Sequence, residues 1–167
     1  STPLYSSAAS DVYKRQPVSV ISTGIGCPSA AMVMQDLGKH ECRNVIRVGT
    51  AGSCHIDVKP GDNVIGIAAV RDEGLTEKFL PAIYPAVADL KVINALKLST
   101  KKQNIKTHTG VVHTSDAFSS PKLENDIQLA QTAGILAFEM EAAAILMLGA
   151  LYKIRAVSYT HLRAHET

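Results

Sequence analysis

The most chemically suggestive stretch of the sequence places two carboxylates, Glu139 and Glu141, on either side of Met140, where an apolar strand turns into an apolar helix. Burying a charged side chain without a partner is costly, so two acids in an apolar run need an explanation. They can be a helix-start pair, because the free amides and dipole of a helix N-terminus favour negative charge. They can also form a polar clamp at the carboxyl end of a strand, where open α/β sheets bind ligands. Such a clamp accepts hydrogen bonds from hydroxyls, for example from the vicinal pair of a ribose.

Two glycine-rich turns, at residues 23–26 and 49–52, follow short apolar strands. Turns of this kind often serve packing alone, but at strand ends they also accommodate a phosphate or a nucleotide. A dinucleotide-binding fold needs an acid about 20 residues further on, at the end of the second strand. Here that strand carries Arg47 and Thr50 instead. A guanidinium and a hydroxyl suit an anion better than a ribose diol, although a strand-end ion pair is an equally simple reading of Arg47.

The elements that must position these residues alternate along the chain. Apolar and β-branched runs predict strands at 18–21, 43–48, 63–70, 109–114, 135–138 and from 152. Helices are predicted at 30–37, 89–101 and 122–131, and after the two acids through 148. Residues 71–88 read as a long irregular loop, which is usually functional, with Asp72 and Glu73 on its solvated edge. The alternation predicts an α/β fold with three αβα layers around a central, mostly parallel mixed sheet.

Composition excludes several classes of function. The chain carries 17 Lys and Arg against 15 Asp and Glu, which gives no basis for a nucleic-acid or membrane surface. No apolar run approaches the roughly 20 residues of a membrane span. The three cysteines, Cys27, Cys42 and Cys54, have no zinc-site spacing, so we expect reduced thiols in a cytoplasmic protein without a metal. His108 and His113 are expected to be structural.

The two ends of the chain read differently from the rest. Residues 6–16 match one translated frame of a transposon-type sequencing adapter, and residues 157–167 match a frame of the opposite adapter. Such segments are set aside in fold reasoning. We therefore expect an adapter-derived tail at 1–16, an incomplete domain at 17–156 that is truncated at both ends, and a second adapter-derived tail at 157–167. Both tails should pack against nothing and carry no site.

Four motifs follow one another within 17–156: STGIG at 22–26, RVGTAG at 47–52, SDAF at 115–118 and EMEAA at 139–143. In this order and spacing they resemble the nucleoside phosphorylase family, in the hexamer-forming branch that contains uridine phosphorylase and bacterial purine nucleoside phosphorylase. The resemblance implies phosphorolysis, in which a nucleoside and phosphate give a free base and ribose 1-phosphate. It also implies no cofactor beyond phosphate as co-substrate, a dimer-based homohexamer, and a cytoplasmic place in nucleoside catabolism and salvage.

The resemblance assigns roles residue by residue. Arg47 and Thr50 match the family's phosphate ligands. The nucleoside side is matched by Phe118 beside the base, Met140 against the sugar, Glu141 on the ribose hydroxyls and Glu139 as a further partner at the sugar. Arg47 and Glu141 are then the catalytic pair, because they hold the attacking dianion and the cation-like sugar.

The sequence also departs from the family pattern. The N-terminal phosphate loop with its arginine, the residues donated across the dimer and the base-side acid of purine enzymes are absent, so we expect the fragment by itself to be inactive. The stretch after Phe118 lacks the glutamine–arginine pair that reads uracil, whereas residues 79–81 and 84–89 look like uridine phosphorylases. The balance slightly favours uridine over purine nucleosides.

Two alternatives stay open. A nucleosidase would use water in place of phosphate, and the retained Arg47 and Thr50 argue against it. A non-catalytic dinucleotide-binding module would need an acid after the second strand, and none is present.

Overall fold

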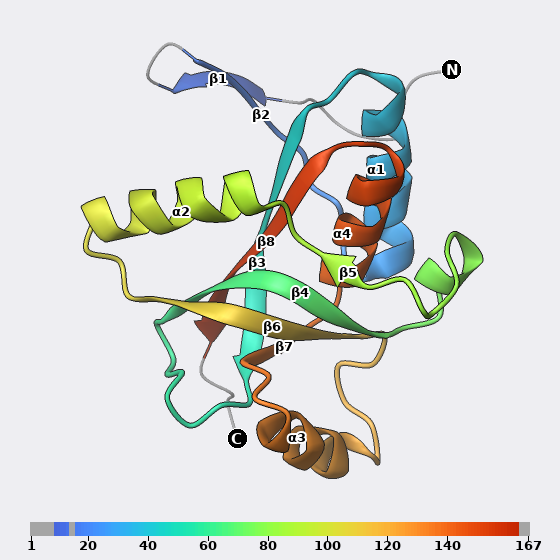
Figure 1. Ribbon diagram of the computed structural model, residues 1–167, viewed down its shortest axis with the longest axis vertical. Helices are drawn as coiled ribbons and strands as arrows, with labels where there is room; N and C mark the ends of the chain where they lie inside the picture. The colour runs from blue at the N-terminus through green and yellow to red at the C-terminus, as the bar shows by residue number, and fades with distance from the viewer. Residues whose placement is uncertain (1–8, 14–15, 164–167) are drawn as a thin grey trace.

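The computed structural model describes residues 9–13 and 16–163, in which strands and helices alternate (Figure 1). The strands are β1 (Ala9–Tyr13), β2 (Gln16–Val20), β3 (Asn44–Ser53), β4 (Asn63–Asp72), β5 (Ala86–Val87), β6 (Thr107–Ser115), β7 (Ala137–Glu139) and β8 (Arg155–Arg163). The helices are α1 (Cys27–Lys39), the 3-10 turn η1 (Thr76–Lys78), α2 (Leu90–Lys102), α3 (Leu123–Thr132) and α4 (Ala142–Leu151). The predicted alternation is confirmed.

The main sheet has six strands in the order β5-β4-β6-β7-β3-β8, and β4 also pairs with β8, so the sheet closes on itself. The two long ladders, β3 with β8 and β4 with β6, are parallel, as is β6 with β7. The antiparallel pairings of β3 with β7, β4 with β5 and β4 with β8 are shorter. The expected mixed α/β sheet, mostly parallel by ladder length, is confirmed.

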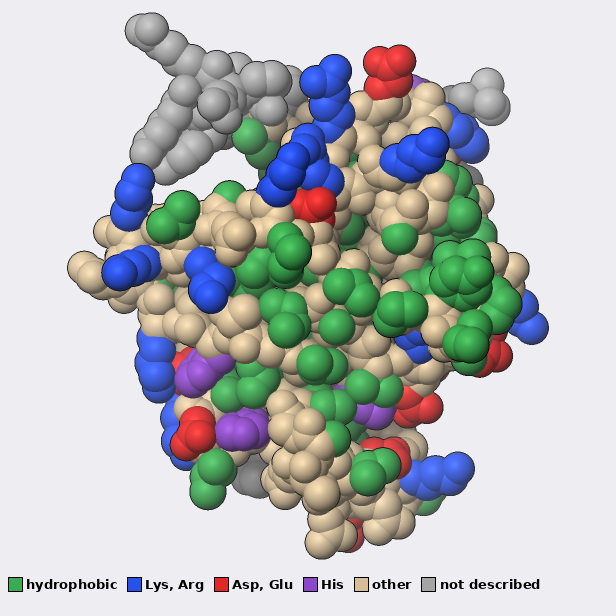
Figure 2. Space-filling model, viewed as in Figure 1, with side chains coloured by type: hydrophobic (Ala, Val, Ile, Leu, Met, Phe, Trp, Pro, Cys, Tyr) green, Lys and Arg blue, Asp and Glu red, His purple; other side chains and the backbone are tan. Residues whose placement is uncertain are grey.

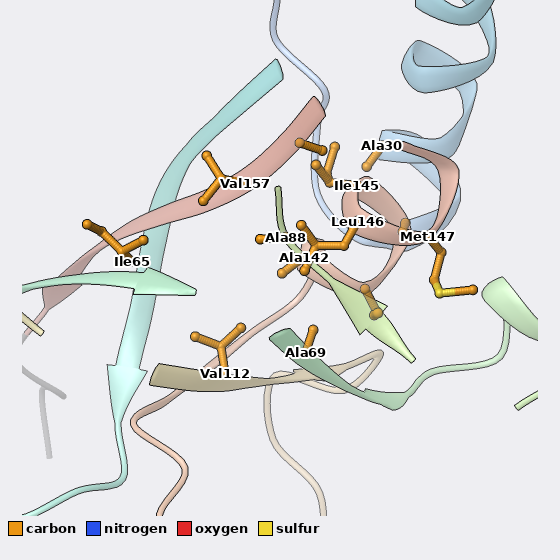
Figure 3. Packing of buried hydrophobic residues seen from close by; sticks show 14 of the residues in the cluster. Ala30, Ile65, Ala69, Ala88, Val112, Ala142, Ile145, Leu146, Met147 and Val157 are labelled. Atoms are coloured by element: carbon orange, nitrogen blue, oxygen red, sulfur yellow. The ribbon is translucent and has the colours of Figure 1, made fainter. Parts of the chain in front are cut away.

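Helix α4 lies at the centre of the core. It is apolar all round, and a helix of that kind must be buried on every side. Figure 3 shows Ile145, Leu146 and Met147 of α4 lying with Ala30 of α1 and Val157 of β8. A smaller cluster of Cys54, Ala130 and Ile135 lies under α3, with Val70 and Phe138 beside it. Helices α4 and α3 thus belong to different packing layers around the sheet (Figure 1).

Helix α2 begins as the sequence predicts. Asp89 is its N-cap, and its side chain accepts from the backbone N–H of Lys91 at 2.9 Å and of Val92 at 3.1 Å. These bonds satisfy donors that a helix start leaves free.

The expectation for residues 157–167 is wrong as far as 163. Residues 155–163 form β8, which runs parallel to β3 over its whole length and antiparallel to β4. Val157, Ser158 and Thr160 are fully buried and Leu162 is 1% exposed. The physical reason is composition: whatever codons they come from, Val, Tyr and Thr suit a pleated, half-buried strand, and this one closes the sheet. The adapter origin itself stays a prediction.

The other predicted tail lies only partly within the described residues. Strand β1 pairs antiparallel with β2, from Ala9 opposite Val20 to Tyr13 opposite Gln16. This two-stranded sheet is separate from the main one. Val18 and Val20 of β2 are 46% and 67% exposed, so the strand predicted at 18–21 exists but lies outside the core. Residues 1–8 and 14–15 of the predicted tail lie outside the described residues.

Candidate active site

A cluster of charged side chains lies where β7 gives way to α4, beside β3. Nη2 of Arg47 forms an ion pair with Oε2 of Glu141 and lies 3.3 Å from Oε2 of Glu139. The side chains of Arg47 and Glu141 are each 9% exposed, and that of Glu139 is 0% exposed. One guanidinium therefore faces two carboxylates in an almost closed environment.

Glu139 is held by donors from two elements. Its Oε1 accepts from the hydroxyl of Thr114 on β6. Its Oε2 accepts from the backbone N–H of Glu141 at 2.9 Å and of Ala142 at 2.7 Å. These amides belong to the start of α4, where free N–H groups and the helix dipole favour negative charge. For Glu139, the helix-start interpretation of the sequence holds.

Glu141 is reached from a different direction. Its Oε1 accepts from the backbone N–H of Gly26 at 2.7 Å. Gly26 has φ 87° and ψ 159°, a conformation that is essentially restricted to glycine. The turn at 23–26, which the sequence offered as a phosphate turn, here holds the carboxylate of Glu141. The Cys27 thiol next to it donates to the carbonyl of Met140 at 3.4 Å.

Two further residues of the cluster were missed from the sequence. A Cβ added at Gly49 would lie 2.7 Å from the guanidinium of Arg47, so a larger residue there would displace it. Ser158 on β8 accepts a 3.4 Å hydrogen bond from Nη1 of Arg47. Gly49 was visible as part of a glycine turn, whereas Ser158 was set aside with the predicted tail. In the parallel pairing of β3 with β8, Ser158 lies opposite Arg47.

Thr50 and Phe118 do not join this cluster. The turn expected at 49–52 is absent because β3 continues through it without a break in register. Thr50 is three strand positions from Arg47, so it points to the opposite face of β3, and it is exposed. Phe118 is 81% exposed in the loop after β6. Met140 is half-buried between the two acids. Their ligand roles remain predictions.

The long loop 71–88 is held by hydrogen bonds from its own side chains, Glu73 and Arg71. Glu73 is 9% exposed and accepts from the backbone N–H of Leu75 at 2.7 Å and of Thr76 at 2.9 Å. The expectation that Glu73 lies on a solvated edge is therefore wrong, because its carboxylate caps the turn η1. Arg71 donates to the carbonyls of Leu80 at 2.7 Å and Pro81 at 2.8 Å, which fixes the rest of the loop.

The two histidines contact residues outside the Arg47 cluster, and their structural role stays a prediction. His113 stacks on Phe138 with ring centroids 4.4 Å apart and pairs with the exposed Asp72 at 3.1 Å. His108 pairs with Asp62 at 2.8 Å at the far end of β6. Neither lies among the partners of Arg47.

Two surface hollows lie away from the Arg47 cluster. One surface hollow of about 340 Å³ is lined by residues 87–89 and by the ends of α4 and β8, and another of about 480 Å³ by residues 53–56 and Gln131. Neither includes Arg47, Glu139 or Glu141. In residues 9–13 and 16–163 there is no grouping of His, Cys, Asp and Glu that could hold a metal ion. The same residues contain no helix with the length and apolarity that crossing a bilayer requires.

Burial dominates the electrostatics of the cluster. Desolvation raises the pKa of Glu139 above its ordinary value of 4.5, while the Arg47 charge and the donors on the carboxylate oppose the rise. Burial likewise raises the pKa of the Cys27 thiol, with the charges of Glu73, Glu139 and Asp116 adding to the rise. Cys27 is thus a neutral thiol rather than a nucleophile.

The fold and this junction of two acids and an arginine define a phosphorylase-type α/β protein. The chain matches the phosphorylase superfamily over residues 8–164 and belongs to that family. It is 36% identical over 156 residues to uridine phosphorylase of Thermococcus kodakarensis, covering 86% of this chain and 56% of the relative. It is 36% identical over 149 residues to a DeoD-type purine nucleoside phosphorylase of Streptococcus suis, covering 87% of this chain and 62% of the relative.

A third relative is guanosine phosphorylase of Halorubrum lacusprofundi, 32% identical over 144 residues, or 86% of this chain and 59% of the relative. Among solved structures, uridine phosphorylase of Vibrio fischeri complexed with 6-hydroxy-1-naphthoic acid superimposes with a TM-score of 0.89 at 29% identity, covering 93% of this chain and 65% of that one. The family membership expected from the motifs is confirmed. The chain spans only 56–62% of the length of these three relatives.

Proposed function

We propose that the protein is a nucleoside phosphorylase, a pentosyltransferase that cleaves the N-glycosidic bond of a nucleoside with inorganic phosphate. The observation that supports it most is the meeting of Arg47 with Glu139 and Glu141 at the strand–helix junction of a phosphorylase fold. A cation-like sugar develops in this reaction, and carboxylates stabilise it, while a guanidinium keeps the phosphate dianion in place.

Arg47 and Glu141 carry the reaction in this proposal. Arg47 binds phosphate with Thr50, and Glu141 accepts from the ribose hydroxyls, with Met140 against the sugar and Phe118 beside the base. Because Arg47 pairs with Glu141 in the structure, a phosphate that binds the guanidinium competes with that carboxylate. An exchange of these partners frees the carboxylate for the ribose.

The finer assignments belong to the same proposal. Uridine is slightly favoured over purine nucleosides, phosphate is the sole co-substrate, no cofactor is used and the enzyme works in the cytoplasm. A homo-oligomer is supported by large apolar side chains left on the surface, among them Ile83 at 86%, Val87 at 54% and Leu90 at 73% exposure (Figure 2). The activity is that of the complete enzyme, and the 167-residue chain alone is expected to be inactive.

The test is phosphate-dependent release of base. The complete enzyme is incubated with uridine, inosine or guanosine, with and without inorganic phosphate, and free base and ribose 1-phosphate are separated by chromatography. We expect both products only when phosphate is present. Release of base and free ribose without phosphate would instead identify a nucleosidase. NADH binding with no turnover of any nucleoside would identify a dinucleotide-binding module.

A further inference from the structure

The carboxylate of Glu139 is mostly engaged by donors of the protein itself. An ionised carboxylate offers about four lone-pair positions. Thr114 donates to Oε1, while the amides of Glu141 and Ala142 and the guanidinium of Arg47 lie on Oε2. Oε2 of Glu139 is therefore fully engaged, and about one acceptor position remains on Oε1.

Glu141 differs in this count. Its Oε1 accepts from the amide of Gly26 and its Oε2 pairs with Arg47. About two acceptor positions remain, which is the number that a vicinal diol requires. The two acids thus have separate tasks, with Glu141 available to a ligand and Glu139 engaged in holding the protein together around Arg47.

Thr114 determines how Glu139 is held. It lies opposite Glu139 in the parallel pairing of β6 with β7, and it is fully buried. Its oxygen accepts from the backbone N–H of Ala143 at 3.0 Å, which leaves its one hydroxyl proton to be given to Glu139. A single side chain thereby connects the end of β6, the end of β7 and the first turn of α4.

We infer that Thr114 is a positioning residue: through Glu139 it fixes the guanidinium of Arg47 in the orientation that receives phosphate. The inference rests on the proposed function for the identity of the ligand, but the orientation of Arg47 does not depend on turnover. Removing the hydroxyl frees Oε1 of Glu139 and loosens that carboxylate, so that Arg47 is held by Glu141 and by the 3.4 Å bond to Ser158.

The ionisation of Glu139 couples to this arrangement. The charged or titratable groups around it are Arg47 on β3, Glu141 before α4 and the neutral Cys27 thiol on α1. When Glu139 takes up a proton, the carboxyl group can no longer accept from every donor around it. Without the Thr114 hydroxyl, the ionised form loses one donor, so protonation moves to higher pH.

The experiment observes Arg47 directly in the 167-residue chain. Nitrogen NMR of the guanidinium groups, assigned with Arg47→Lys, reports whether rotation of the Arg47 side chain is restrained. The variants are Thr114→Val, which keeps the shape without the hydroxyl, Thr114→Ser, which keeps the hydroxyl, and Thr160→Val. The last is a matched control, because Thr160 is also fully buried in a strand and donates only a 3.5 Å bond to Val64.

We expect restrained, separate Nη signals in the wild type, in Thr114→Ser and in Thr160→Val, and averaged signals in Thr114→Val. Carbon NMR of the Glu139 carboxyl group should show its titration at higher pH in Thr114→Val than in the other three proteins. In the wild type, the Arg47 signals should move at the same pH as the Glu139 carboxyl, a result that needs no variant to fold. Restrained Arg47 in Thr114→Val, or Arg47 signals that ignore the Glu139 titration, would overturn the inference.

Inorganic phosphate separates this inference from the proposed function. Added phosphate should shift the wild-type Arg47 signals, and Thr114→Val should need about tenfold more phosphate for half the shift, the usual effect of losing one charge-assisted bond. If phosphate leaves Arg47 untouched while Thr114→Val still loosens it, the positioning role stands and the phosphate role fails. If phosphate does shift the wild-type signals, and Thr114→Val reaches half of its shift at the same phosphate concentration, the positioning role is overturned.

Discussion

Two clusters of charged side chains lie at different places in the sheet, and they are built in opposite ways. Just before β4, the carboxylate of Asp62 pairs with Lys106 and with the His108 ring, each at 2.8 Å, and it also accepts from the amide of Lys59 at 3.0 Å. Beside β3, Arg47 is one cation with two carboxylate partners, Glu139 and Glu141. The first cluster surrounds one acid with a lysine and further hydrogen-bonding groups, and the second places two acids around one cation.

This difference is the one we expect between a structural cluster and a cluster that binds a ligand. The partners of Asp62 hold the pKa of that carboxyl well below its ordinary value of 3.8, so the acid is fully compensated. Burial around Glu139 raises its pKa, so the charge there is only partly compensated. A group whose pKa is perturbed by burial beside a specific charge partner is a candidate for a functional site. The predictions below test whether the two clusters really differ in this way.

The largest effect is expected for Glu141→Gln in the complete enzyme. The change keeps the shape but removes the charge and one acceptor, and bonds to the ribose hydroxyls strengthen as the sugar becomes cation-like. The specificity constant kcat/KM should fall about ten- to a thousandfold, or roughly 1.5–4 kcal/mol. A 2′-deoxynucleoside should lose less than the ribonucleoside, because it already lacks one hydroxyl. Equal losses for both substrates would remove Glu141 from the ribose.

Arg47→Ala should have the second-largest effect on the kinetics. Losing a charge-assisted contact to phosphate costs about 1.5–3 kcal/mol, which is roughly ten- to a hundredfold in phosphate KM. Steady-state kinetics at varied phosphate measures it. Glu141→Gln makes the informative comparison, since it leaves Arg47 with one fewer competing carboxylate and should lower the phosphate KM. A raised phosphate KM in Glu141→Gln would contradict the exchange of partners proposed for Arg47.

Glu139→Gln tests, through the free energy of unfolding, whether burial or the Arg47 charge dominates at Glu139. A raised pKa means that the folded chain retains a proton that the unfolded chain releases near pH 4.5. The contribution of Glu139 to the free energy of unfolding is therefore highest at low pH and is lost as pH rises through the folded pKa. Chemical denaturation from pH 4 to pH 7 should show the wild type losing stability relative to Glu139→Gln. A difference that grows in the other direction would mean that the Arg47 charge outweighs burial.

Asp62→Asn should show the opposite sign and the smallest effect. The lowered pKa of Asp62 gives stability that is present above its ordinary value of 3.8 and is lost as pH falls below it. Thermal unfolding should find the variant less stable at pH 7 and equal to the wild type in strong acid. Phosphate-dependent turnover should be unchanged, because this cluster has no part in the site. A loss of turnover at unchanged stability would instead mean that Asp62 takes part in catalysis or substrate binding.

The sequence by itself determined the alternation of strands and helices, the family, and the two acids at the junction of β7 and α4. These follow from local signals: periodicity, the cap at Asp89, the apolar run of α4 and the spacing of the four motifs. Such signals act over a few residues, so they survive without knowledge of the fold. Local signals predict the ends of strands and helices less well. For example, β3 continues through the glycines at 49–52, where a turn was predicted.

Only the tertiary structure decided which partners each acid receives. Thr114 reaches Glu139 across 25 residues, Arg47 reaches Glu141 across 94, and the Gly26 amide reaches Glu141 across 115. Those contacts are set by strand pairing and by the approach of α1 to α4, which no local pattern records. The burial of Ser158 beside Arg47 is likewise a result of the tertiary structure. A segment of Val, Ser, Tyr and Thr becomes a core strand only when neighbouring strands have free edges to pair with it.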